Sequence, residues 1–152
     1  MMLLPTILAP AALIAAGDLV TAETATVEDV ANSAAMCMLS AGKDGADKSR
    51  FENDAWVPSE GGYRHVSAPV TVEFPADKDG IARTCVVHAV LAETGDQTTL
   101  AKKLNEMLKT KALKQSGSDV WMVSTTTGFR GIQFYTDNQS DQPKVRLIGA
   151  AF

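Results

Sequence analysis

The sequence contains few of the residues from which catalytic and metal sites are usually built. Only two histidines and two cysteines occur among its 152 residues. There is no G-x-S-x-G nucleophile turn, no H-E-x-x-H zinc motif and no glycine-rich phosphate loop. These absences argue against the commonest hydrolases, zinc proteases and nucleotide-binding enzymes. We expect no cofactor, and a non-catalytic protein is favoured over an enzyme.

The chain also lacks a strong excess of charge of one sign. The formal net charge is −4, and the basic residues are scattered except for a group of lysines between residues 102 and 114. Nucleic-acid-binding domains usually concentrate basic residues on one surface, so no nucleic-acid partner is expected. The length favours one domain with a modest hydrophobic core.

Long hydrophobic runs are absent except at the N-terminus, where residues 3–16 are almost entirely apolar. A membrane-spanning helix needs about 20 apolar residues, whereas this run has the length of a signal-peptide core and is followed by small residues ending at Ala22. We therefore expect a signal peptide over residues 1–22, cleaved near Ala22. The remaining single domain, 23–152, would be periplasmic or extracellular, with no stable membrane insertion. Because no basic residue precedes the run, a retained N-terminal segment is the alternative.

The two cysteines are predicted to form a disulfide, as an even cysteine count in an exported chain usually does. Cys37 lies on the apolar face of a predicted helix, and Cys85 lies on the apolar face of a predicted strand. The bridge would join the two layers. Met36-Cys37-Met38 and Cys85-x-x-His88 also resemble a copper site. However, alternate helix residues diverge, and Cys85 and His88 face opposite sides of a strand. No metal site is therefore expected.

The periodicity of apolar residues predicts two helices and five strands. A helical pattern covers residues 26–39 and 97–114, and an alternating pattern covers 63–74, 82–92, 120–126, 131–136 and 144–151. The order α-β-β-α-β-β-β favours an α+β two-layer sandwich, with an antiparallel sheet of about five strands and both helices on one face. Residues 42–62 read as a long loop, with a turn around Asp77–Gly80 and Phe152 closing the core.

Five residues are candidates for binding. Phe51, Trp56 and Tyr63 lie on or beside the expected loop, and His65 and His88 lie on the first predicted hairpin. We expect Trp56 to anchor the loop. Strand register would place His88 near Glu73 or Thr71 on the face away from the helices, as a polar cross-strand pair or an acid–base pair.

We therefore expect a small exported binding or interaction module without a catalytic motif. Its partner would be another exported protein or a component of the cell envelope, bound at strand edges, at the loop or on the uncovered sheet face. The alternative is a small extracytoplasmic enzyme that uses His65 and His88 with nearby carboxylates. A copper-binding protein is a lesser alternative.

Overall fold

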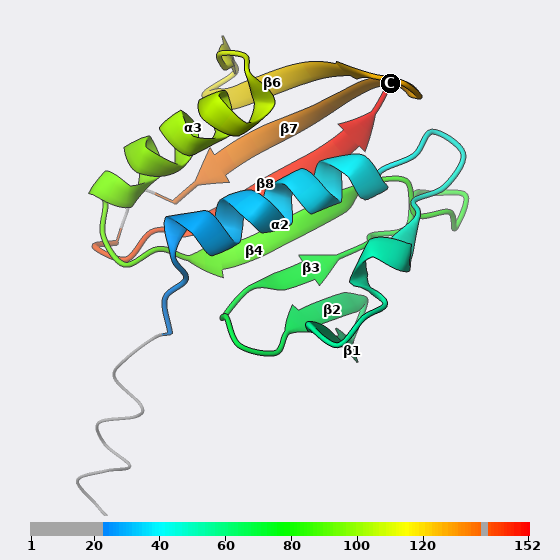
Figure 1. Cartoon of the computed structure of the whole chain (residues 1–152), viewed down its shortest axis with the longest axis horizontal. Helices are drawn as coiled ribbons and strands as arrows, with labels where there is room; N and C mark the ends of the chain where they lie inside the picture. The colour runs from blue at the N-terminus through cyan, green and yellow to red at the C-terminus, as the bar shows by residue number, and fades with distance from the viewer. Residues whose placement is uncertain (1–22, 138–139) are drawn as a thin grey trace, which may run out of the picture.

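A computed structural model describes residues 23–137 and 140–152. The expected signal peptide, 1–22, lies outside the described residues. One antiparallel sheet, in the order β1-β2-β3-β4-β8-β7-β6-β5, is covered on one face by α2 and α3, which lie side by side (Figure 1). In chain order the elements are α2 (Val27–Ser40), the 3-10 helix η2 (Lys48–Phe51), β1 (Trp56–Ser59), β2 (Gly62–His65), β3 (Thr71–Glu73), β4 (Cys85–Val90), α3 (Gly95–Leu108), β5 (Leu113–Gln115), β6 (Ser118–Thr125), β7 (Gly128–Thr136) and β8 (Lys144–Ala151).

The α+β class is confirmed, but the expectation of about five strands was wrong because the described sheet has eight. The segment 63–74 is divided into β2 and β3 by a turn that contains Pro69, which has no N–H for a strand ladder. The expected loop 42–62 also forms β1 and η2, and Gly61, with φ 76°, turns the chain between β1 and β2.

The third additional strand arises because α3 ends earlier than expected. Lys109 adopts the left-handed conformation, with φ 54° and ψ 37°, and its backbone N–H donates to the carbonyl of Asn105. This C-cap stops the helix at Leu108. The chain is then free to form β5, which pairs with β6 at one edge of the sheet.

The chain consists of two successive halves of similar topology. Each half begins with a long helix and continues with a four-stranded meander, β1–β4 in the first half and β5–β8 in the second. The halves meet at the antiparallel pairing of β4 with β8, which runs from Cys85 opposite Gly149 to Val90 opposite Lys144. The centre of the sheet therefore combines the last strand of each half.

The helix layer contacts the sheet most closely where α2 crosses this central pair. The predicted disulfide between Cys37 of α2 and Cys85 of β4 is confirmed, with a Cα–Cα distance of 5.1 Å. A Cβ at the neighbouring Gly149 would lie 2.8 Å from the backbone of Cys37. Glycine at this position therefore allows α2 to pack directly on the sheet.

The second helix covers the β6 side of the same face. Leu100 and Leu104 of α3 are fully buried, as is Trp121 of β6. The Trp121 indole N–H donates to Asn105 Oδ1 of α3 at 2.8 Å, which satisfies its buried polar group. Neither α2 nor α3 nor any other described helix has the length and hydrophobicity needed to cross a membrane.

Candidate binding surface

The three aromatic candidates form a cluster on the helix side of the sheet. The ring of Phe51 lies 4.9 Å from that of Trp56 and 5.7 Å from those of Tyr63 and Phe74. Phe51 is fully buried and Trp56 is 6% exposed, whereas Tyr63 is half-buried. Trp56 thus anchors the 42–62 segment to the core, as expected. Phe51 and Trp56 present little surface to a partner.

His65 builds the turn between β2 and β3. Its Nδ1 accepts hydrogen bonds from the backbone N–H groups of Ser67 and Ala68, both at 3.1 Å. Its ring also stands edge-on to Trp56, with 4.8 Å between the ring centroids. With Nδ1 accepting, the neutral imidazole carries its proton on Nε2. These contacts give His65 a structural role in holding the turn.

His88 lies on the opposite face, which no described helix covers and which we call the open face. It pairs with Thr71 in the β3–β4 ladder, and its Nε2 lies 3.5 Å from Glu73 Oε1. The predicted proximity of these residues is therefore confirmed. Their side chains are 43% and 51% exposed, so their mutual interaction is screened by water. Arg64, the neighbour of His65 in β2, pairs with Thr71 and therefore lies on the same face as His88. Because successive strand residues face opposite sides, His65 lies on the other face, and the two histidines are not brought together.

The described residues provide no ligand set for the copper alternative. Cys37 and Cys85 are both used in the disulfide, so neither is a free thiolate. His88 and Cys85 also face opposite sides of β4, since Cys85 points toward α2. Within residues 23–137 and 140–152, no three His, Cys, Asp or Glu side chains are grouped closely enough to hold a metal ion.

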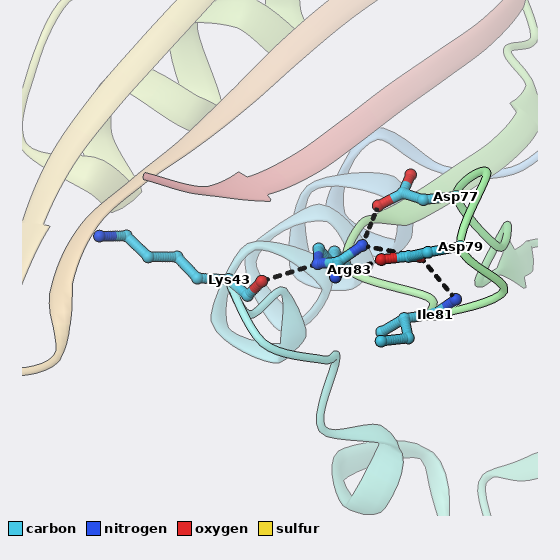
Figure 2. Close-up of polar contacts among 5 residues, drawn as sticks. All are labelled: Lys43, Asp77, Asp79, Ile81 and Arg83. Carbon is cyan, nitrogen blue, oxygen red and sulfur yellow. Dashed lines mark hydrogen bonds and ion pairs between the residues drawn. The ribbon is translucent and has the colours of Figure 1, made fainter.

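The acidic turn after β3 is neutralised by an arginine (Figure 2). The Arg83 guanidinium donates to Asp79 at 2.7 and 3.0 Å and to Asp77 at 3.0 Å, while its Nε donates to the Lys43 carbonyl at 2.8 Å. Hydrogen bonds from Arg83 and from the Ile81 backbone lower the pKa of Asp79 from 3.8 to about 2. The cluster therefore fastens the turn to the loop after α2, which is a structural role.

A polar row crosses the open face on five neighbouring strands. Arg64 on β2 aligns with Thr71 on β3, His88 on β4, Arg146 on β8 and Tyr135 on β7. The Arg146 guanidinium lies 4.7 Å from the centroid of the Tyr135 ring, a cation–π contact. It forms no ion pair with any other described residue.

Beside this row, the open face of β5–β8 bears an apolar depression of about 390 Å³, which we call the open-face hollow. Gly131 lines it, and a Cβ at this position would be 3.1 Å from Met122 Sδ and 3.2 Å from the Phe152 ring. Phe152 is 56% exposed, so the expectation that it closes the core was wrong. The apolar side chains that line it include Leu113, Val120, Met122, Ile148, Ala150 and Phe152.

Comparison with known proteins adds no relative. No protein-family description, curated protein or solved structure matches this chain.

Proposed function

We propose that this protein is an exported binding module that holds a component of the cell envelope on the open face of its sheet. One observation carries the proposal: within residues 23–137 and 140–152 the helices cover only one face of the sheet, and the other face exposes large apolar side chains around a hollow. Leu113 is 59% exposed, Met122 38% and Phe152 56%. A contiguous apolar area of this kind is typical of interaction and ligand sites, because a partner removes it from water.

The proposed compartment is supported by the disulfide and by the apolar N-terminal run. Disulfides persist in oxidising compartments such as the periplasm and the extracellular space. The bridge is fully enclosed, with Cys37 1% exposed and Cys85 0% exposed. A binding role is favoured over the enzyme alternative because His65 and His88 lie on opposite faces of the sheet.

Export is tested by the intact mass of the protein recovered from its native host. A chain that begins at Glu23 and gains about two daltons on reduction would support cleavage and oxidation, since two sulfur atoms each acquire a hydrogen. An uncleaved chain in the cytoplasmic fraction would overturn the proposed compartment.

Binding on the open face is tested by photo-crosslinking in the host. A photoreactive amino acid replaces Met122 in the open-face hollow, and the matched control replaces Lys102, an exposed residue of α3. We expect an adduct from position 122 that excess unlabelled wild-type protein suppresses, and none from position 102. The mass of the adduct separates an envelope lipid from another exported protein. Equal adducts at both positions, or none, would overturn the open face as the binding surface.

A further inference from the structure

We propose, building on the binding function above, that the open-face hollow holds the apolar chain of one anionic amphiphile and that Arg146 binds its anionic head. An amphiphile here means a single molecule with one hydrocarbon chain and a carboxylate or phosphate group.

The cation stands at one end of the hollow. Ile148 of β8 and Gln133 of β7 line the hollow and are opposite each other in the sheet. The next side chains on the same face of these strands are Arg146 and Tyr135, which are also paired. Arg146 and Tyr135 are two positions along their strands from Ile148 and Gln133, a distance of about 7 Å. A chain in the hollow can therefore extend its head toward the Arg146 guanidinium.

Arg146 is positioned by the Tyr135 ring and retains donors for a ligand. A guanidinium stacked on an aromatic face still directs N–H groups outward from its edge. Because no ion pair forms between Arg146 and another described residue, a carboxylate or phosphate would gain a charge-assisted interaction there.

The other charges of the open face also favour Arg146 as the contact. Arg64 is a second cation in the polar row, but it lies on β2, three strands away from Arg146. The carboxylate of Glu73 lies beside His88. Lys144 is the next cation along β8, but the Asp137 N–H donates to its carbonyl, so an acidic residue lies opposite it. The cation beside the hollow is therefore Arg146.

The hollow fits a small molecule better than a second copy of the chain. Its volume of about 390 Å³ lies within the range of small-molecule sites. A twofold dimer through the open face would bury the polar row of both copies in one interface. The Arg64 and Arg146 side chains of both copies would then lose water, which is unfavourable.

The probes are laurate, a twelve-carbon carboxylate, and 1-lauroylglycerol, which carries the same chain with an uncharged head. Each is added as a monomer to the oxidised, ¹⁵N-labelled protein, and the amide shifts of Gly131 and Ala150 report occupation of the hollow. We expect laurate to shift both signals, and the Arg146→Gln variant to weaken laurate about tenfold or more, because a charge-assisted interaction is lost. The same variant leaves 1-lauroylglycerol unchanged. Arg50→Gln, the same charge change on η2, is the matched control.

Blocking the hollow should weaken both probes. Met122→Asp places a carboxylate in the hollow, and Val57→Asp is its matched control because Met122 and Val57 are both 38% exposed. If Met122→Asp does not fold, Leu113→Asp at the edge of the hollow replaces it. Equal weakening by the control would overturn the assignment of the hollow as the site.

Three outcomes would overturn the inference while leaving the proposed function to its own cross-linking test. Equal binding of both probes with no effect of Arg146→Gln would exclude an anionic head. Binding to phosphatidylglycerol vesicles without any response to monomeric laurate would assign the surface to membranes. Concentration-dependent shifts of Gly131 without added probe would assign it to a second copy of the chain.

Discussion

Breaking the Cys37–Cys85 bridge should remove a large share of the stability of this fold. The cysteines are 48 residues apart in sequence, and the chain-entropy relation gives about 4 kcal/mol for a closed loop of that size. Small domains are stable by only about 5–15 kcal/mol. We therefore expect the reduced protein to remain folded but to unfold at a much lower urea concentration. Because the unfolded chain becomes more expanded, the dependence of the unfolding free energy on urea should also become steeper.

The assay is urea unfolding followed by tryptophan fluorescence, with and without reductant. Trp121 is fully buried and Trp56 is 6% exposed, so unfolding transfers both indoles to water and changes the signal. A variant with alanine at both cysteines should match the reduced protein and show no further response to reductant. If the unfolding free energies of the oxidised and reduced proteins differ by less than about 1 kcal/mol, with the same urea dependence, the bridge does not stabilise the fold by restricting the unfolded chain.

Three further perturbations examine the packing and the polar contacts. Gly149→Ala should destabilise the protein by about 1–3 kcal/mol in urea unfolding, because the new methyl group meets the backbone of α2, whereas Gly95→Ala, with open space around it, should not. Asn105→Ala should cost about 1–3 kcal/mol in the same assay by leaving the buried indole N–H of Trp121 unpaired; retention of wild-type stability would contradict that hydrogen bond's importance. The pKa of Asp79 is lowered to about 2, so its charge stabilises the fold above about pH 4 and this contribution is lost as the pH falls through 2. The stability difference between wild type and Asp79→Asn should therefore shrink from pH 5 to pH 2, and a constant difference would refute the assignment.

The helices and the disulfide could be predicted because each depends on local patterns. α2 begins after Thr26, whose hydroxyl oxygen accepts a hydrogen bond from the backbone of Asp29, and its apolar stripe recurs at helical spacing. The same spacing placed Cys37 on the buried face, and strand alternation placed Cys85 on the face toward it. The proximity of His88 to Glu73 followed from the register of one hairpin.

The sheet edges and the open-face hollow could not be predicted in the same way. β1 has four residues including Pro58, and β5 follows a helix that ends at Leu108, where the left-handed C-cap residue is Lys109 rather than the usual glycine. The hollow is lined by residues of β5 to β8 and by Phe152, and neither β5 nor the exposure of Phe152 was expected from the sequence. Periodicity assigns residues to faces within a strand but does not order the strands. The contact between Arg146 and Tyr135 could therefore not be predicted from the sequence, because it depends on the register of β7 with β8.

The central position of β8 also affects the order in which the fold can form during synthesis. The first half of the chain contains both cysteines, so its helix and meander can associate before the second half has been made. Until then β4 has an unpaired edge, which can capture the wrong strand. β8 is the last of the eight strands to emerge, yet it joins the two meanders. The sheet can therefore be completed only after the final strand has been made. A chain that ends before residue 144 would lack β8 and would leave the edges of β4 and β7 unpaired.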